Sequence, residues 1–497
     1  MHLSTLVEMI ESGLEDRALL QHDGPVTGAE LVARARAGAA SLDGATALAY
    51  VGENHPLLPV ALLAAALAGV AFVPVNYRLE DEQVHELLDR QPGAVVLADP
   101  RTASRLAPRR AVRTLDDWLA VDARAEGPAI EAPATDDDQV AIVLYTSGTT
   151  AAPKSALLRQ RHLMAYLLGT VDFASAGEDE AVLVSVPPYH IAGMANLLSN
   201  LVAGRRLVYL RTFAADRWLD TVRRERITHA MVVPTMLARI VDHLDGAPAE
   251  VPTLRSLSYG GAKIAERVVR DALVAFGDTG FVNAYGLTET ASTVAVLGPE
   301  DHREALHAED PAVRRRLASA GRLLPTVEAE VRDEDGRPVP AGGTGLLHVR
   351  GEQIAGEYAT GSVLDADGWF CTRDRVRIDA DGYVFIEGRA DDTIIRGGEN
   401  IAPAEIEDVL LEHPTVAQAC VVGVPDEEWG QRILAVVVPS AGATIDAEAL
   451  RTLVRDRLRG SKTPEAVVVR DALPHTDTGK LLRRAVAAEL AAAPAAP

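Results

Sequence analysis

The chain has few cysteines, no long apolar run and no leader-like N-terminus. Its two cysteines, Cys371 and Cys420, supply neither a disulfide framework nor the spacing of a metal site. The Ala/Leu-rich stretch over residues 60–75 is shorter than the ~20 residues that a membrane-spanning helix needs. Glu8 and Glu11 interrupt the N-terminal segment and argue against a secretory signal peptide. We therefore expect a soluble, cytoplasmic protein.

Positive charge is scarce as well. The chain has 49 Lys and Arg against 71 Asp and Glu, a net charge of −22. This balance argues against a nucleic-acid-binding surface and against attraction to anionic membranes. It leaves a bound nucleotide open, because a few local cations are enough to hold a phosphate. With 497 residues, of which 48% are hydrophobic, the chain is long enough for two to four domains around a large core.

Short β-branched runs alternate with helical stretches through the first three quarters of the chain. This alternation predicts α/β layers built on mostly parallel sheets. The expected strands are residues 47–51, 71–75, 95–97, 181–184 and 207–210, with an apolar helix over residues 59–67. Residues 375–387 differ, because two strand-like runs flank an Asp381-Gly382 turn, which predicts a β-hairpin.

A second unit is expected from Arg389 onward. Pro403 suits the first turn of a helix, and Ile406, Val409 and Leu410 follow at helical spacing. Strands over 416–424 and 433–438 and a helix over 447–458 would complete a compact α+β domain of roughly 100 residues. The Ala/Pro-rich residues 487–497 are expected to fray.

One hydroxyl-rich loop is the most informative segment. It is Tyr145-Thr146-Ser147-Gly148-Thr149-Thr150-Ala151-Ala152-Pro153-Lys154, which follows an apolar run and ends in one of only four lysines. Gly148 lets the backbone come close, hydroxyl and N–H groups donate hydrogen bonds, and Lys154 adds a compact positive charge. The segment predicts a phosphate-binding loop. The alternative is a surface turn, and the spacing is not that of the common P-loop ending in Gly-Lys-Ser/Thr.

Further polar or glycine-rich segments lie downstream. Each alone has an ordinary interpretation: His190 is more often a structural histidine, and Glu289 a solvated surface acid. Their order along the chain carries the information. The segments are Pro187 to Met194, Ser258 to Lys263, Asn283 to Thr290, Thr372 to Asp374, Gly388 to Asp392, Gly397 to Asn400 and Pro474 to Lys480.

Together these segments resemble the adenylate-forming superfamily, which comprises acyl-CoA synthetases, adenylation domains that charge carrier proteins, and firefly-type luciferases. The resemblance extends from residue 64 to Lys480 and rests on motifs in the family's order. It implies an α/β fold with a large N-terminal domain of layered, mostly parallel sheets, a small β-barrel-like subdomain and a small, mobile α+β C-terminal domain. The implied domains are residues 1–388 and 389–497, with a hinge near Asp391.

The resemblance also implies a role for each matching residue. The β- and γ-phosphates of ATP would be gripped by Thr146, Ser147, Gly148, Thr149, Thr150 and Lys154. The adenine would be lined by Gly260, Gly261 and Ala262 and by the Asn283-Ala284-Tyr285-Gly286 segment, with Tyr285 stacked on the ring. Asp374 and Arg389 would hold the ribose. Thr288 would bond the α-phosphate, Glu289 would place Mg²⁺, and Lys480 would bridge the carboxylate and the α-phosphate.

A pocket for the acid and a tunnel for the thiol are implied in the same way. The acyl pocket would be lined by His190, which gates it, and by Ala192, Gly193, Met194, Val233, Ser258 and Leu287. These side chains are mostly small or apolar, which predicts an uncharged acyl or aryl body. Gly397 and Gly398 would line the thiol tunnel, where missing side chains leave room.

Three positions depart from the family pattern. Ala151 stands where glycine is usual in the phosphate loop, and Arg373 stands where glycine usually precedes the ribose aspartate. His475 replaces a common arginine or lysine near the final lysine. None of these changes removes a catalytic group. They bear on loop conformation and rate more than on the reaction.

The expected activity is that of an acid–thiol ligase. ATP converts a small carboxylic acid to acyl-AMP with release of pyrophosphate, and coenzyme A then takes the acyl group as a thioester. The expected cofactors are ATP, Mg²⁺ and coenzyme A, without nucleic acid or membrane insertion, and a homodimer is allowed. The stretches Gly397 to Ile401 and Glu427 to Gly430, and the lack of an aspartate beside His190, favour an acyl-CoA synthetase over an amino-acid adenylation domain.

Three alternatives remain open at this point. The first is an enzyme that loads the acid onto the phosphopantetheine thiol of an acyl carrier protein. The second is a non-catalytic nucleotide sensor on the same fold, against which the presence of Thr288, Glu289, Asp374, Arg389 and Lys480 argues. The third is a light-emitting oxygenase, although nothing in the sequence marks an oxygen site.

Overall fold

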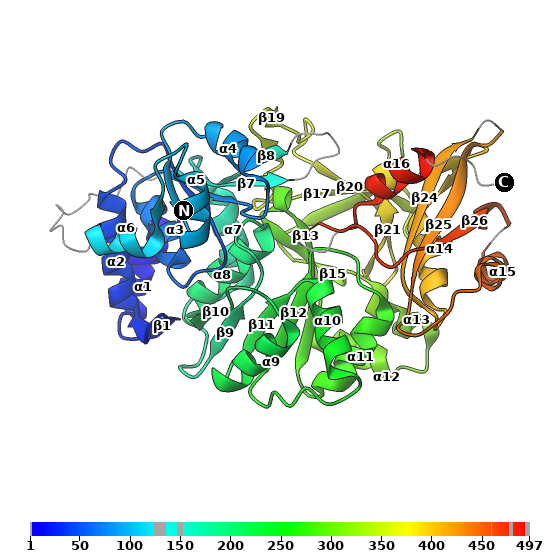
Figure 1. The fold of residues 1–497 in the computed structure, drawn as a ribbon, viewed down its shortest axis with the longest axis horizontal. Helices are drawn as coiled ribbons and strands as arrows, with labels where there is room; N and C mark the ends of the chain where they lie inside the picture. The colour runs from blue at the N-terminus through cyan, green and yellow to red at the C-terminus, as the bar shows by residue number, and fades with distance from the viewer. Residues whose placement is uncertain are drawn as a thin grey trace.

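The computed structural model describes residues 2–122, 136–146, 153–426, 428–458, 460–476 and 481–492. Its first three quarters form one large layered body (Figure 1). The last quarter, coloured orange to red, forms a smaller unit at the right-hand side of that view. The two termini therefore lie in different parts of the molecule.

Two large sheets form the frame of the body. Within the described residues, the first has nine strands in the order β15 (Arg322–Leu323), β14 (Ser292–Leu297), β13 (Gly280–Leu287), β12 (Ser256–Gly260), β11 (His229–Val232), β9 (Ala181–Val184), β10 (Arg206–Tyr209), β1 (Ala18–Gln21) and β2 (Pro25–Thr27). The second has eight described strands, β19 (Gly361–Ser362), β18 (Glu357–Tyr358), β8 (Lys154–Arg159), β7 (Val140–Thr146), β4 (Ala71–Val75), β3 (Ala47–Val51), β5 (Val95–Ala98) and β6 (Arg113–Thr114).

Strand direction in both sheets agrees with the sequence. Neighbours from β13 to β1 run parallel, as do neighbours from β7 to β6. Antiparallel pairs occur at the margins, for example β13 with β14 and β7 with β8. The prediction of mostly parallel, layered sheets is confirmed.

Helices fill the space between the sheets and cover their outer faces. The core between the sheets holds α1 (Ser4–Gly13), α2 (Gly28–Ala40), α3 (Leu58–Leu67), α6 (Leu115–Asp122), α7 (Gln160–Thr170) and α8 (Ile191–Ala203). The outer face of the first sheet carries α9 (Ala215–Arg224), α10 (Pro234–Leu244), α11 (Glu266–Phe276) and α12 (Pro299–His307), followed by α13 (Pro311–Arg314) and η2 (Arg315–Ala318). The outer face of the second sheet carries α4 (Asp81–Asp89) and α5 (Pro100–Leu106).

Local sequence explains how β3 and α3 occupy these layers. Successive side chains of a strand point to opposite faces. Accordingly Leu48 and Tyr50 of β3 enter the core between the sheets, whereas Ala49 and Val51 enter the outer core. Every residue of α3 is buried, as expected for a helix that is apolar on all sides. The apolar helix predicted over residues 59–67 is confirmed.

A third sheet is the counterpart of the predicted barrel-like subdomain. It is antiparallel, and its described strands are β16 (Glu328–Arg332), β17 (Thr344–Arg350), β20 (Phe370–Ile378) and β21 (Val384–Arg389). Strands β20 and β21 form the predicted hairpin, with Gly382 at φ +83° in the turn. This hairpin brings Asp374 and Arg389 opposite each other.

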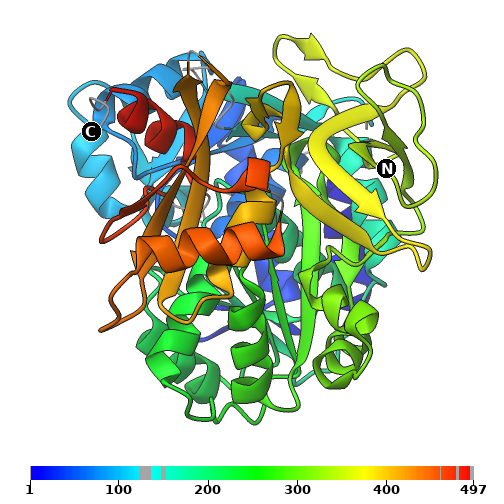
Figure 2. The same cartoon turned by 90° about the vertical axis from the view of Figure 1, so that its right-hand side faces the viewer.

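The small C-terminal unit follows β21 through the short helix η3 (Ala390–Asp392). Its elements are β22 (Ile394–Arg396), β23 (Glu399–Ile401), α14 (Pro403–Leu411), β24 (Val416–Asp426), β25 (Gly430–Pro439), α15 (Ala447–Arg457), η4 (Gly460–Lys462), β26 (Ala466–Val469) and α16 (Arg483–Ala492). Figure 2 shows the long β24–β25 pair with α15 lying across it. Helices α14 and α15 pack on one face of the sheet, and α16 packs on the other.

The expectation that residues 487–497 fray is wrong for the part of that segment that the structure describes. Helix α16 continues to Ala492. Val486 and Leu490 of this helix are buried against β24 and β25, where Val422 and Val436 lie. Burial of these two side chains stabilises a helix that composition alone did not predict. In the described part of the chain, no helix has the length and apolar character required to cross a membrane.

Candidate active site

Asp374 is the centre of a buried polar cluster where β20 and β21 meet the end of β13. The Tyr285 hydroxyl donates a hydrogen bond to Oδ2 of Asp374 at 2.6 Å, and Nη1 of Arg389 donates to Oδ1 at 2.9 Å. An ionised carboxylate offers about four lone-pair positions and only accepts, a chemistry that suits ribose hydroxyls as donors. The structure thus joins three of the predicted nucleotide-binding residues directly.

Electrostatics keep the two donors of this cluster, Tyr285 and Arg389, protonated. Burial, followed by the Asp374 carboxylate, raises the pKa of Tyr285 well above its ordinary value, so the phenol stays protonated and donates. Burial alone would lower the pKa of Arg389, but the Asp374 carboxylate outweighs it and the pKa of the guanidinium is raised. Glu289 adds to this effect, which places a second acidic residue within electrostatic reach of Arg389.

Glu289 belongs to a second cluster, in the short helix η1 (Thr288–Thr290) that follows β13. Its side chain is almost fully buried, with the residue 9% exposed. The Tyr358 hydroxyl donates a hydrogen bond to Oε1 of Glu289. The ring of Tyr358 lies beside Lys154, whose Nζ is 5.1 Å from the ring centroid. Lys154 and Glu289 therefore flank one tyrosine, and Thr146 lies opposite Lys154 in the β7–β8 ladder.

The glycines at the ends of β12 and β13 have steric functions. A Cβ on Gly260 would lie 2.1 Å from the Ala284 carbonyl oxygen, and one on Gly286 would lie 1.8 Å from the Ser292 carbonyl oxygen. Gly261, at φ +89°, then turns the chain out of the sheet toward Ala262.

These contacts fix the backbone around the predicted adenine site. In the same segment, Nδ2 of Asn283 donates to the Ser319 carbonyl at 3.0 Å. The adenine-lining role of these residues stays a prediction. Ser147, Gly148, Thr149, Thr150 and Lys480 lie outside the described residues, so their roles stay predictions as well.

The residues predicted for the acyl pocket lie in different environments. Met194 is fully buried in the core between the sheets, and Val233 is buried under the helices of the first sheet. A Cβ on Gly193 would lie 2.4 Å from the Pro187 carbonyl oxygen, so close backbone packing requires this glycine. Packing therefore explains these three residues without reference to a ligand.

The remaining pocket residues are less enclosed. His190 precedes α8, and its ring packs on Tyr189 with the ring centroids 4.4 Å apart. Ala192, Ser258 and Leu287 are all partly exposed. These four residues are the ones that remain available to contact an acid, and the pocket stays a prediction.

The predicted hinge and thiol-tunnel residues follow β21. Asp391 lies in η3 and forms an ion pair with Arg373 of β20. Gly397 and Gly398 form the two-residue turn between β22 and β23, with φ of +56° and +81°. A hairpin turn with two positive φ angles favours glycine strongly, so local geometry explains this pair. Their roles in rotation and thiol passage stay predictions.

The sequence analysis missed the contacts of two residues, Tyr358 with Glu289 and Arg373 with Asp391. Tyr358 was not singled out, and Arg373 was noted only as a departure from the family pattern. Tyr358 is 69 residues from Glu289 in the chain, so no local periodicity links them. The available signal was the short Gly356-Glu357-Tyr358 run after a strand, which a single sequence does not connect to the phosphate site.

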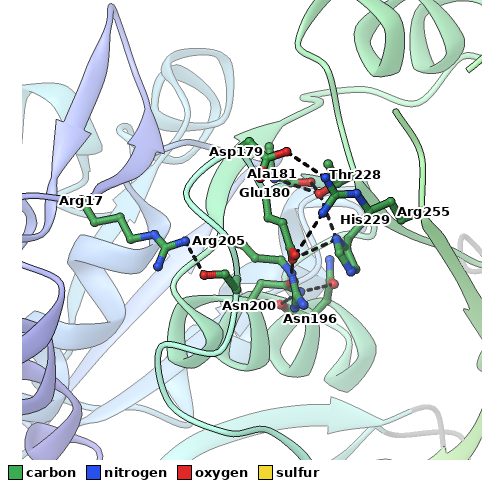
Figure 3. Close-up of polar contacts among 11 residues, drawn as sticks. Arg17, Asp179, Glu180, Ala181, Asn196, Asn200, Arg205, Thr228, His229 and Arg255 are labelled. Atoms are coloured by element: carbon green, nitrogen blue, oxygen red, sulfur yellow. Dashed lines mark hydrogen bonds and ion pairs between the residues drawn. The ribbon is translucent and has the colours of Figure 1, made fainter. Parts of the chain in front are cut away.

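A separate polar cluster lies at the amino ends of β9, β11 and β12 (Figure 3). Glu180 accepts a hydrogen bond from Nε of Arg205 at 2.7 Å and one from Nη1 of Arg255 at 3.3 Å. His229 lies 3.6 Å from the same carboxylate, and burial lowers the pKa of this histidine to about 4. Because the predicted site lies at the carboxyl ends of these strands, this cluster is structural.

In the described residues, neither two surface cavities nor the acidic side chains form a second candidate active site. One surface cavity of about 510 Å³ lies beside β10 and α9, and another of about 470 Å³ lies beside residues 78–82. Neither is lined by a predicted site residue. The described part of the chain holds no group of three or more His, Cys, Asp or Glu side chains placed to bind a metal ion.

Comparison with family models decides the classification. Residues 10–359 match the model described as AMP-binding enzyme, and residues 405–480 match the AMP-binding enzyme C-terminal domain. The chain belongs to the AMP-binding enzyme family. The predicted domain boundary at residues 388 and 389 falls between the two matched segments and stays a prediction.

Curated relatives of this AMP-binding enzyme include CoA ligases and a fatty acid–[acyl-carrier-protein] ligase, ScoC of Streptomyces coeruleorubidus, which is 34% identical over 465 residues and covers 90% of this chain and 87% of the relative. The indoleacetate–CoA ligase of Aromatoleum aromaticum is 34% identical over 455 residues, covering 87% of this chain and 86% of the relative. The feruloyl-CoA synthase of an Amycolatopsis species is 35% identical over 455 residues, covering 88% and 87%. Thus the predicted AMP-forming acid–thiol ligase activity is confirmed at the level of the reaction class.

A solved structure extends the likeness to the whole chain. ATP-bound MatB from Rhodopseudomonas palustris has a TM-score of 0.87 at 27% identity, covering 99% of each chain. The apo structure of MatB from the same organism has a TM-score of 0.78 with the same coverage. The predicted fold class is confirmed. At equal coverage, the structure is more similar to the ATP-bound form of MatB than to the apo form.

Proposed function

We propose that this enzyme activates an aromatic carboxylic acid with ATP and transfers the acyl group to coenzyme A. The observation that carries the substrate class is the pair of relatives named for indoleacetate and ferulate, both aromatic acids. The partly exposed Ala192, Ser258 and Leu287 are small or apolar and add no charge, which suits a flat, uncharged acyl body.

In the first step, a carboxylate oxygen of the acid attacks the α-phosphorus of ATP. The new O–P bond forms while the bond to pyrophosphate breaks. Both reactants are anionic, so the site must neutralise charge without blocking in-line attack. We assign Asp374 and Arg389 to the ribose, Tyr285 to the adenine and Thr288 to the α-phosphate. Lys154 would supply positive charge to the β- and γ-phosphates, and Lys480 would supply it to the carboxylate and the α-phosphate.

Glu289 is suited to hold Mg²⁺ that enters with ATP. Magnesium is usually bound by one or two carboxylates together with phosphates and water. Tyr358 occupies Oε1 of Glu289, whereas Oε2 accepts no hydrogen bond from any residue that the structure describes. One carboxylate oxygen is therefore left for a cation. When bound, the ion neutralises phosphate charge.

In the second step, the thiol attacks the acyl carbonyl carbon. A C–S bond forms, the C–O bond breaks with its electron pair leaving on the phosphate of AMP, and the thiol proton passes to water. We propose that the C-terminal unit rotates about Asp391 between the steps and that Gly397 and Gly398 then line the path of the thiol. A hinge residue has to absorb a large backbone change, which the short helix η3 permits.

The deciding experiment measures pyrophosphate release over a panel of acids, with and without coenzyme A. We expect aromatic acids with one carboxylate to give pyrophosphate, and coenzyme A to yield the aryl or arylalkyl thioester. Thioester formation only on an acyl carrier protein would show that the acceptor is the carrier's phosphopantetheine. Tight ATP binding without pyrophosphate from any acid would instead show a nucleotide sensor.

A Lys480→Ala variant tests the division of labour between the steps. Loss of one well-placed charge should lower acyl-AMP formation by ~10²–10³-fold. ATP binding and thioester formation from supplied acyl-AMP should persist, because neither needs this lysine. An equal loss in both half-reactions would contradict the two-arrangement mechanism.

We also propose a cytoplasmic location. The two cysteines, Cys371 and Cys420, are both free thiols. Reduced cysteines are usual in a reducing compartment, where ATP and coenzyme A are available.

A further inference from the structure

Among the described residues, Tyr358 connects Glu289 with Lys154. Its hydroxyl donates to the Glu289 carboxylate, and its ring lies beside the Lys154 ammonium. An ionised carboxylate only accepts hydrogen bonds, so the phenol hydroxyl is the donor in this contact.

The chain around Tyr358 encloses Glu289 from several sides. The backbone N–H groups of Ala355 and Gly356 both donate to the Glu289 carbonyl at 2.9 Å. Nε2 of the buried Gln353 donates to the carbonyl of Thr290 at 3.1 Å. Backbone contacts therefore fix where Glu289 lies, and the Tyr358 hydroxyl fixes the direction of its carboxylate.

Strand β18 holds Tyr358 against the strand that carries Lys154. Tyr358 lies opposite Ala156 in the β18–β8 ladder, and Ala359 N–H donates to the Ser155 carbonyl at 2.9 Å. The neighbouring Glu357 accepts two hydrogen bonds from Arg159, at 2.7 and 2.6 Å. Such a bidentate pair is geometrically specific. The tyrosine is thus anchored independently of any ligand.

We infer that Tyr358 is a positioning residue, which holds the Glu289 carboxylate for the cation and the Lys154 ammonium for the phosphates before Mg·ATP binds. The inference rests on the proposed function. The inference adds to the proposed function that one side chain, Tyr358, positions both the group that binds the cation and the group that binds the phosphates.

Two physical effects support this role. Donation of a hydrogen bond to a carboxylate holds it in one orientation, so less side-chain freedom remains to be lost when it binds a cation. An ammonium beside an aromatic ring is attracted by the negative face of the ring. This attraction restricts a flexible side chain that would otherwise lose more entropy when it binds phosphate.

Tyr358→Phe isolates the hydroxyl, because the ring beside Lys154 remains. The Mg²⁺ concentration for half-maximal pyrophosphate release should rise about 10–100-fold, the usual effect of removing a group that orients a metal ligand. Saturating Mg²⁺ should restore most of kcat. Calorimetry should show weaker binding of ATP in the presence of Mg²⁺ and unchanged binding of AMP without metal.

Tyr358→Leu removes the ring as well as the hydroxyl. The KM for ATP should then rise further at saturating Mg²⁺, because Lys154 loses its aromatic neighbour. The difference between the Phe and Leu variants measures the contribution of the ring. Equal KM values for ATP in the two variants would overturn the Lys154 part of the inference.

Tyr383→Phe is a matched control. Tyr383 also donates its hydroxyl to a carboxylate, that of Asp301 at 2.6 Å, and its ring lies beside Arg316 and Arg322 at 4.6 and 4.3 Å. It lies outside the proposed site. This variant should lose a similar amount of thermal stability and leave the Mg²⁺ dependence unchanged.

A double-mutant cycle separates positioning from general loss of structure. In a Glu289→Gln background, Tyr358→Phe should cause little further change in Mg²⁺ dependence, because the carboxylate it orients is gone. Additive effects of the two substitutions, or a Tyr358→Phe enzyme with wild-type Mg²⁺ dependence, would overturn the inference. Failure of the unmodified enzyme to release pyrophosphate from any acid would instead overturn the proposed function.

Discussion

At the scale of single residues, Arg373 combines backbone strain with a charge contact. Its φ of +62° lies in the left-handed region, which costs a non-glycine residue roughly 1–2 kcal/mol. The family resemblance places glycine here, and the observed φ explains why. The Arg373 side chain is 60% exposed and pairs with Asp391. An exposed pair contributes about 0.2–1 kcal/mol, so it offsets only part of the strain.

Substitution of Arg373 tests this balance. Arg373→Gly relieves the strain but loses the ion pair and adds chain entropy to the unfolded state, so its stability should stay within about 1 kcal/mol of the wild type. Arg373→Ala loses the pair and keeps the strain, so it should be about 1 kcal/mol less stable than the glycine variant. Urea unfolding at pH 7 gives both values. Equal stability of the two variants would contradict the strain argument.

Four other residues show how much of the candidate site could be predicted from the sequence. Tyr285, Asp374 and Arg389 were named from motif order, and the structure joins them by hydrogen bonds. Motif order works here because each residue lies within a strand of a recurrent segment, in β13, β20 and β21. Tyr358 was missed because its strand has only two residues, and its contact with Glu289 depends on how distant segments pack.

At the scale of elements, buried strands and apolar helices were predicted well. Strands β3 and β4 match the expected residues 47–51 and 71–75, because continuous apolar runs of this length fit a strand buried on both faces. Helix α16 was missed because its Ala-rich sequence lacks a strong periodic signal. Only packing against β24 shows that its few large side chains are buried.

The polar cluster at the amino ends of β9 and β11 makes fold stability depend on pH. His229 faces Glu180, Arg205 and Arg255, and burial, with the arginines, lowers its pKa to about 4. The ordinary pKa of histidine is about 6.5, so the unfolded chain binds a proton that the folded chain excludes. The contribution of neutral His229 to the free energy of unfolding is therefore full above pH 6.5 and is lost as the pH falls toward 4.

A His229→Gln variant should therefore be less sensitive to acid. Between pH 7 and pH 5 the wild type should lose about 2 kcal/mol of unfolding free energy through this histidine, and the variant should not lose that part. Urea unfolding at the two pH values provides the measurement. His162, whose pKa burial also lowers to about 4, lies on α7 and serves as an independent comparison. An identical pH dependence in the wild type and in His229→Gln would contradict the assignment.

At the scale of the whole molecule, an ion pair connects the large body to the C-terminal unit. Nζ of Lys263, in the turn after β12, lies 2.7 Å from Oδ1 of Asp408 on α14. Both side chains are about half exposed. The molecule as a whole is more similar to ATP-bound MatB, with a TM-score of 0.87, than to apo MatB, with a TM-score of 0.78. We therefore expect the pair to favour the arrangement that carries out the first half-reaction.

Charge reversal provides the test. Asp408→Lys places like charges at this contact and should shift the population away from the present arrangement. Because an exposed pair contributes about 0.2–1 kcal/mol, pyrophosphate formation should slow only about two- to fivefold, and the effect should fade at high salt. Thioester formation from supplied acyl-AMP should not slow. Combining Asp408→Lys with Lys263→Asp restores opposite charges and should recover the first half-reaction. If both half-reactions slow together and the double variant does not recover, the contact stabilises the fold and does not select between arrangements.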